Sequence, residues 1–205
     1  MTEADDTYQT IEAPAEGLFK DKGSKFIGYA YPLANEEEVK QYIAELRELH
    51  PKARHYCWAY RLSPDRTVFR VNDDGEPSGS AGKPILNTLL SNNLTNILVV
   101  VVRYFGGTLL GVPGLINAYK QATQEAIHEA TLVEKTVNEV YRIDFDYLQM
   151  NDVMKVMKDD NVRILNQQFD NQCSLEFMVR KALVETMVGK LEKTSGVSVR
   201  WIATV

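Results

Sequence analysis

The segment from Leu94 to Tyr104 constrains the fold more than any other part of the chain. It reads LTNILVVVVRY, which is nearly continuous in apolar and β-branched residues. A strand with one face in water alternates apolar and polar side chains, whereas a strand buried on both faces is apolar throughout. We therefore predict a central β-strand here, covered on both of its faces.

Two glycine-rich junctions flank this strand. The first, DDGEPSGSAGKP (73–84), joins a strand predicted at 67–72 to a helix predicted at about 81–90, with Ser80 as its N-cap. The second, FGGTLLGVPG (105–114), leads from the central strand into another helix. A helix N-terminus has unpaired N–H groups and the positive end of a dipole, which favour an anion. Each junction is therefore a candidate anion site.

Polar side chains at the junctions fit this hypothesis, but the spacing matches no known phosphate loop. Ser78, Ser80 and Lys83, together with Arg103 and Thr108, would complement a phosphate or a carboxylate. Prolines stand where a P-loop needs its first glycine and its magnesium-binding hydroxyl, and Gly106-Gly107-x-x-x-Gly111 misses the dinucleotide-binding spacing. The alternative is that the glycines serve only tight turns and close helix–sheet packing.

Two further groups of residues, three carboxylates and a histidine–cysteine pair, can each be interpreted in two ways. Asp73, Asp74 and Glu76 could hold Mg²⁺, or they could form turns through their own backbone. His55 and Cys57 share one face of a predicted strand, as a base and a nucleophile would, yet no third member is evident. A partly buried histidine beside a structural cysteine is the alternative. The cysteines and histidines lack zinc-site spacing, so we predict no metal and no cofactor.

The chain changes character near residue 131. The polar segment 131–138 has the composition of a linker, and the pattern beyond it predicts a βαββαβ order, which is typical of ferredoxin-like domains. The expected elements are strands at 141–147, 162–169, 173–179 and 197–203 and helices at 150–157 and 182–191. We predict two domains, residues 1–134 and 135–205.

Charge and composition narrow the class of protein. The chain has 205 residues and a net charge of −5, which argues against nucleic-acid binding by bulk charge but leaves a local basic cleft possible. Lys20, Lys22 and Lys25 could form a small basic patch with Phe26, or could simply be solvated. The acidic N-terminus, MTEADDTYQT, is unlike a signal peptide, and the longest apolar run is too short to cross a membrane. We expect a cytoplasmic protein without a membrane partner.

Four stretches of the sequence resemble the IMPACT family, whose bacterial members are called YigZ-like. They are KGSKFIGYA (22–30), HYCWAYRL (55–62), DDGEPSGSAGKPIL (73–86) and VVVRYFGGTLLGVPGLINAY (100–119). Their order matches from about residue 15 to 130, and 135–205 resembles the bacterial C-terminal domain. Val112-Pro113 departs from the small residues that family members more often have there, and it stiffens the start of that helix.

The resemblance implies an α+β fold in two domains: an α/β sandwich like domain IV of elongation factor G, then a ferredoxin-like βαββαβ domain. Eukaryotic members restrain a kinase that phosphorylates a translation initiation factor, but they do so through an additional N-terminal domain, so that role is not carried over to this chain. What the resemblance implies is an association with translation, by family and by analogy of fold.

We therefore predict a cytoplasmic, translation-associated regulatory protein that binds RNA, the ribosome or a translation factor through a glycine-rich cleft in the first domain. The alternative is an enzyme acting on a phosphorylated or nucleotide-like small molecule in the same cleft, and the sequence leaves both classes open. The predicted binding residues are His55, Asp74, Gly75, Glu76, Ser78, Gly79, Ser80, Gly82, Lys83, Arg103, Gly106, Gly107 and Gly111.

Overall fold

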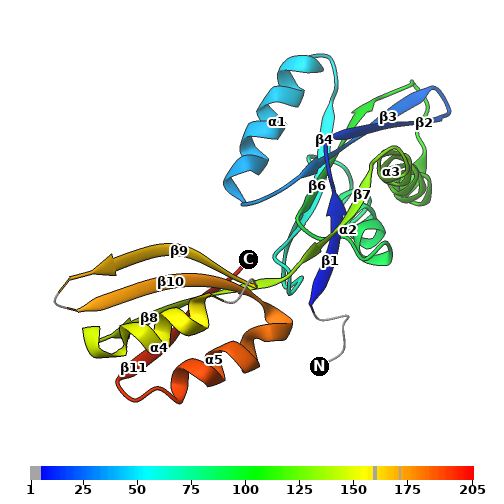
Figure 1. Cartoon of the computed structure of the whole chain (residues 1–205). Helices are drawn as coiled ribbons and strands as arrows, with labels where there is room; N and C mark the ends of the chain where they lie inside the picture. The colour runs from blue at the N-terminus through cyan, green and yellow to red at the C-terminus, as the bar shows by residue number, and fades with distance from the viewer. Residues whose placement is uncertain (1–5, 159–160, 171) are drawn as a thin grey trace. The chain divides into compact units, whose positions relative to one another are not determined.

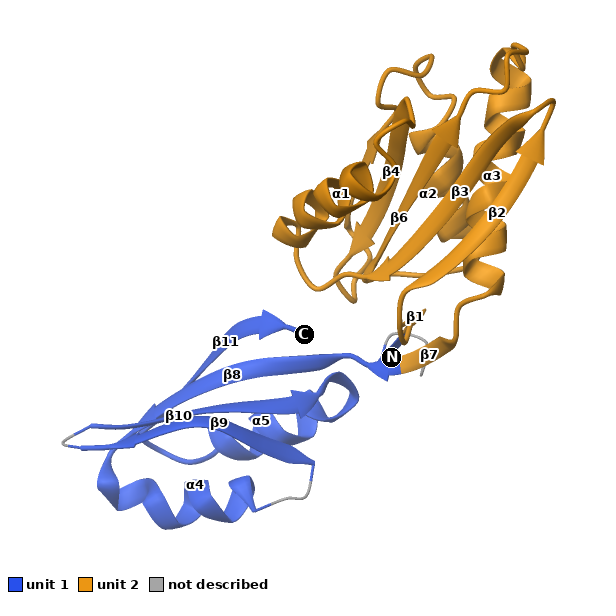
Figure 2. Cartoon of the chain, turned by 90° about the horizontal axis from the view of Figure 1, so that it is seen from above, with its two compact units in different colours: residues 1–8, 135–205 blue, residues 9–134 orange. Residues whose placement is uncertain are grey.

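The computed structural model describes residues 6–158, 161–170 and 172–205. It is a mixed α/β structure whose contacts divide the chain into two compact units, residues 9–134 and residues 1–8 with 135–205 (Figure 2). The predicted mixed α/β character is confirmed, whereas the assignment of a specific fold to each domain stays a prediction. Among the described residues, no helix is long and apolar enough to cross a membrane.

The first unit is built on an antiparallel sheet with the predicted strand at its centre. The sheet order is β2 (Ala15–Asp21), β3 (Ser24–Pro32), β6 (Ile97–Tyr104), β4 (His55–Leu62) and β5 (Val68–Asn72). Helix α1 (Glu37–Leu49) covers one face, and α2 (Gly82–Ser91) and α3 (Gly111–His128) cover the other (Figure 1). Strand β6 is buried from Ile97 to Arg103, so the prediction of a strand covered on both faces is confirmed.

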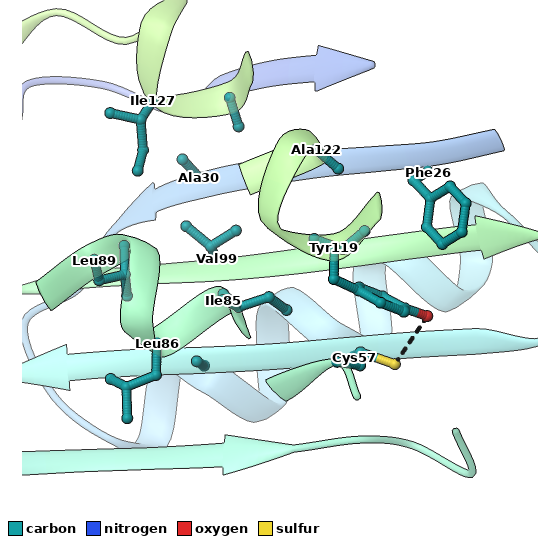
Figure 3. Packing of buried hydrophobic residues seen from close by; sticks show 14 of the residues in the cluster. Phe26, Ala30, Cys57, Ile85, Leu86, Leu89, Val99, Tyr119, Ala122 and Ile127 are labelled. Atoms are coloured by element: carbon teal, nitrogen blue, oxygen red, sulfur yellow. Dashed lines mark hydrogen bonds between the residues drawn. The ribbon is translucent and has the colours of Figure 1, made fainter. Parts of the chain in front are cut away.

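Alternate residues of β6 belong to two separate cores. Val99 and Val101 pack with residues of α2 and α3, among them Ile85, Leu89 and Tyr119 (Figure 3). Leu98, Val100 and Val102 pack on the opposite face with Val39 and Leu46 of α1. The apolar side chains of β6 are thus buried on both faces of the sheet. Each fully buried aliphatic side chain stabilises the fold by about 1.5–3 kcal/mol relative to an exposed one.

Helix α3 lies directly on the backbone of the β2–β3 hairpin. Gly17 pairs with Gly28 across the two strands. A Cβ atom on Gly17 would lie 2.2 Å from the nitrogen of Ala126, and one on Gly28 would lie 2.4 Å from the oxygen of Ala122. Only glycine fits at either position, because α3 occupies the space where a side chain would be. Side chains alternate along a strand, so residues of β2 and β3 that lie an odd number of positions from these glycines point to the face opposite to α3.

The second unit contains the six elements in the predicted order. They are β8 (Asn138–Phe145), α4 (Met150–Met157), β9 (Val162–Phe169), β10 (Cys173–Arg180), α5 (Val184–Glu192) and β11 (Val197–Thr204). The sheet order is β11-β8-β10-β9, and all of its neighbours are antiparallel. Val153 and Met157 of α4 and Met187 and Leu191 of α5 share one core with the sheet.

The expected linker at 131–138 is a strand for most of its length. Strand β7 (Leu132–Thr136) pairs with β1 (Thr7–Ile11) in a separate two-stranded sheet. Its side chains are mostly exposed, which explains the polar composition that suggested a linker.

Candidate functional site

The first junction is held by Asp73, which caps helix α2. Its carboxylate accepts hydrogen bonds from the backbone N–H groups of Gly79 (2.8 Å), Ala81 (3.1 Å) and Gly82 (2.8 Å). The expectation that Ser80 is the cap is wrong, because its hydroxyl donates to the carbonyl of Pro77 at 2.6 Å. The helix N-terminus thus already has an anion of the chain's own, which removes the main reason to expect an external phosphate there.

Asp74 ties the same loop to α1 and β4. Its carboxylate accepts from the backbone N–H of Tyr56 at 2.7 Å and pairs with Arg47 at 3.1 Å. Its backbone carbonyl lies 2.9 Å from Nδ1 of His55. A carbonyl can only accept, so Nδ1 carries a proton. The loop therefore fixes the orientation of the His55 ring.

Glu76 is the centre of a buried polar network. Its side chain is 4% exposed, and its Oε1 accepts from Nη1 of Arg103 at 2.5 Å and from the hydroxyl of Tyr119 at 2.8 Å. Nε2 of His55 lies 3.9 Å from the same oxygen. The network continues to Cys57, whose thiol lies 3.3 Å from the Tyr119 hydroxyl (Figure 3). Arg103 is 6% exposed, so the ion pair sits almost out of water.

Cys57 fits a structural role better than a nucleophilic one. Burial raises the pKa of its thiol well above the ordinary value, although the hydrogen bond with Tyr119 opposes the shift. The thiol also donates to the carbonyl of Asp73 at 3.0 Å. A thiol that stays protonated and enclosed is a poor nucleophile. The contacts of the His55 ring are with Asp74 and Glu76.

The three carboxylates of the junction are engaged by the chain's own donors. Asp73 binds backbone N–H groups, Asp74 binds Tyr56 and Arg47, and Glu76 binds Arg103 and Tyr119. Within the described ranges, no group of three or more His, Cys, Asp or Glu side chains is placed to hold a metal. The three side chains therefore hold the loop to other parts of the chain, rather than forming turns through their own backbone.

A cleft of about 440 Å³ opens beside this network. His55, Glu76 and Arg103 line it, together with the exposed Arg54 at the start of β4. The remaining lining is formed by Gly75, Pro77, Phe105, Leu109, Leu110, Gly111, Val112 and Leu115. Since Arg103 is paired with Glu76, the buried polar groups of the cleft have little net charge, and Arg54 adds one exposed cation to the lining. The walls are mainly apolar.

The structure divides the predicted binding residues between two hollows. His55, Gly75, Glu76, Arg103 and Gly111 line the cleft, and Asp74 lies behind it, bonded to His55. Gly79 and Lys83 line a second hollow of about 510 Å³ between α2 and α3, where Lys120 is also found.

The other predicted residues line neither hollow. Ser78 is exposed, and Ser80 and Gly82 are buried. Gly107, with a φ of +88°, is exposed. Gly106 packs on the β2–β3 turn, where an added Cβ atom would lie 2.0 Å from the backbone of Gly23.

A line of exposed cations crosses one end of the sheet, and one of them, Arg54, also lines the cleft. Lys20 pairs with Lys25 across β2 and β3, Lys25 pairs with Tyr104 of β6, and Arg54 continues the line just before β4. We call Lys20, Lys25 and Arg54 the basic row; in the part of the chain that the structure describes, none of the three has a carboxylate within 4.0 Å. Phe26, expected to accompany the lysines, is buried in the core.

Sequence reasoning missed Arg54. Its neighbours in the sequence give no pattern that points to the lysines, and only the sheet register places it in line with them, across Tyr104.

Comparisons with known proteins place these features in a family. Residues 22–127 match the family described as "Impact N-terminal domain". The chain is 36% identical to an "IMPACT family member" of Haemophilus influenzae, over 85% of this chain and 86% of that protein. It is 32% identical to "IMPACT family member YigZ" of Escherichia coli, over 93% of this chain and 95% of that one. A solved structure described as that of "an hypothetical protein" is 30% identical, with a TM-score of 0.74 over 97% of this chain and 98% of its own.

Proposed function

Because the chain belongs to the IMPACT family, we propose that it is a translation-associated regulatory protein that binds RNA of the ribosome or of another translation component. The family membership supports the association with translation, and the geometry of the first unit supports RNA as the ligand. The place of action would be the cytoplasm.

The basic row is the observation that carries the RNA proposal. Lys20 and Lys25 point away from Gly17 and Gly28, so they lie on the face of the sheet opposite to α3. Arg54 is exposed at the same end. Unpaired cations spaced along neighbouring strands can follow a phosphate backbone, and Tyr104 lies within the line. The acidic chain as a whole limits such binding to a few contacts.

The glycine-rich cleft contributes in another way. The charge of Arg103 is offset by Glu76, and the N-terminus of α2 is capped by Asp73. Neither is free for a phosphate. We therefore assign the phosphate contacts to the basic row and leave to the cleft a role in recognising another part of the ligand.

The salt dependence of RNA binding tests this function. Each phosphate contact on a single strand contributes about −0.7 to the slope of log affinity against log salt, so three contacts give about −2. Affinity for a single-stranded RNA of mixed sequence should then fall about 20-fold between 50 and 200 mM salt. Replacing all three residues of the basic row by alanine should bring the slope close to zero. Absence of binding by the wild-type chain at 50 mM salt would refute the proposal.

A second double variant tests the alternative location. Lys83 and Lys120 are exposed lysines of the same unit in the second hollow. If Lys83→Ala with Lys120→Ala reduced the slope while the basic-row variant did not, the phosphate contacts would belong to that hollow instead.

His55 supports a second candidate function, an enzyme acting on a small molecule in the cleft. Its ring is oriented by the Asp74 carbonyl and lies beside the buried Glu76 carboxylate, an arrangement that a general acid or base would need. Turnover of any member of a panel of nucleosides and nucleotides, lost in His55→Gln, would favour the enzyme over the binding protein.

A further inference from the structure

We propose that the cleft of the first unit accepts one unpaired nucleobase of the RNA whose phosphates contact the basic row. The inference rests on the proposed RNA binding and adds the chemical part of the ligand that the cleft recognises. The volume of about 440 Å³ lies within the range of about 300–1,000 Å³ that is usual for small-molecule pockets.

The charges in the cleft favour an uncharged group. Glu76 and Arg103 are both more than nine-tenths buried and neutralise each other at 2.5 Å. A phosphate placed beside them would be repelled by the Glu76 carboxylate, and the unpaired cation of the lining, Arg54, is exposed and belongs to the basic row. A nucleobase carries no charge at neutral pH, so it avoids this penalty.

The walls of the cleft suit a flat, weakly polar body. Phe105 is 46% exposed and Leu109 is 84% exposed, although both are large apolar side chains. The guanidinium carbon of Arg103 lies 5.7 Å from the centre of the Phe105 ring, so the ring stands directly beside the polar floor. Bases that are not paired in a helix stack on such aromatic side chains in proteins that bind single strands.

The polar part of the cleft includes a histidine ring of fixed orientation. Nδ1 of His55 is held by the Asp74 carbonyl, and Nε2 lies 3.9 Å from Oε1 of Glu76. His55 is partly exposed and lines the cleft. The edge of a nucleobase carries donors and acceptors next to each other, so it can bond to a polar ring of this kind while its faces contact the apolar walls.

Arg54 connects the two halves of the proposed site. It belongs to the basic row and also lines the cleft. Lys20 and Lys25 lie on the face of the sheet opposite to α3, whereas residues of α3 line the cleft. A strand of RNA that follows the row as far as Arg54 would therefore turn round the end of the sheet to bring a base to the cleft.

Phe105→Ala tests the stacking contact, with Phe69→Ala as a matched control. Phe69 is 55% exposed on β5 of the same unit and is not among the cleft residues. Loss of one base–aromatic contact lowers affinity by about 5- to 150-fold. We expect Phe105→Ala to weaken binding of a single-stranded RNA within this range and to leave the salt slope unchanged. Phe69→Ala should bind like the wild type.

Leu109→Asp places a carboxylate among the cleft residues and should also weaken the binding of a single-stranded RNA. Leu148→Asp is its control, since Leu148 is 88% exposed in the other unit. All four side chains are at least partly in water, so the variants should fold, and thermal unfolding checks this.

An oligonucleotide of equal length with abasic sites distinguishes the phosphate contacts of the basic row from the base contact in the cleft. Its binding should keep the salt slope of the intact RNA but have a lower affinity. Phe105→Ala should not lower that affinity further. Equal affinity for abasic and intact strands, or an unchanged affinity in both cleft variants, would overturn the base pocket and leave the RNA-binding function standing. No RNA binding by the wild-type chain would overturn both.

Discussion

Replacing Glu76 by Gln should destabilise the first unit by about 3–5 kcal/mol, because it leaves the buried Arg103 cation without its counter-ion. The side chains are 4% and 6% exposed, so solvent screens the pair very little. Gln keeps a carbonyl oxygen for the Tyr119 hydroxyl at nearly the same place, so the loss measures the charge rather than the hydrogen bond. For a unit of this size, about 4 °C in Tm corresponds to 1 kcal/mol, which gives a fall of about 12–20 °C.

The two tryptophans allow the units to be followed separately. Trp58 lies in β4 of the first unit and Trp201 in β11 of the second. In a chain that carries Trp201→Phe, urea unfolding monitored by tryptophan fluorescence reports Trp58 alone. The Trp201→Phe variant that keeps Glu76 is the reference, and the Trp201→Phe, Glu76→Gln double variant is compared with it. A loss below about 1 kcal/mol in Glu76→Gln would show that Arg103 does not depend on this carboxylate, and the reasoning on the cleft floor would fail with it.

A thermodynamic cycle tests the pairing itself. Glu76→Met combined with Arg103→Met should cost less than the two single changes added together, because neither charge is left uncompensated. The double variant still leaves the Tyr119 hydroxyl without its acceptor, at a cost of about 1–3 kcal/mol. Adding Tyr119→Phe should recover part of that loss. Strict additivity of the two single changes would contradict a direct interaction.

Three further perturbations have defined outcomes. Asp73→Ala removes the cap of α2 and should lower the free energy of unfolding by about 1–2 kcal/mol in urea titrations, whereas Ser80→Ala should have the smaller effect. Cys57 should resist a thiol reagent at pH 8 until the chain unfolds, because burial raises the pKa of its thiol; rapid labelling of the folded chain would contradict the enclosed network. Burial lowers the pKa of His50 despite the opposing charge of Glu16, so the unfolded chain takes up the proton first as pH falls. Its contribution to stability is present above pH about 6.5 and lost below, and His50→Gln should show a shallower loss of stability between pH 7 and 5.

Local patterns in the sequence were sufficient for the elements and insufficient for the site. The burial of β6 on both faces depends on its own run of valines and isoleucine, so it could be predicted directly. The cap of α2 could not, because Asp73 lies nine residues before Gly82 and reaches it only when the loop folds back. Ser80 is closer in sequence, and proximity was the only guide available.

Pairing between distant residues explains the remaining differences. Glu76 and Arg103 are both candidate binding residues, yet they stand 27 positions apart in the sequence, which hides the ion pair that withdraws Arg103 from anion binding. Lys83 belongs to the same junction in the sequence as Gly75 and Glu76. Its side chain lines the hollow between α2 and α3, whereas Gly75 and Glu76 line the cleft. The sequence of β7 resembles a linker because the strand pairs with β1, which is far from it along the chain.

The loop from Asp73 to Gly82 is fastened at every acidic residue that it contains, and this has a consequence for the rate of binding. The wall of the cleft is already in place before any ligand arrives, so association should need no preceding rearrangement. In rapid mixing, the observed rate should rise in proportion to RNA concentration in a single phase, without the plateau that a slow opening step imposes. The hydrogen bonds and ion pairs that stabilise the loop in the folded chain would thus also affect the association rate constant of the ligand.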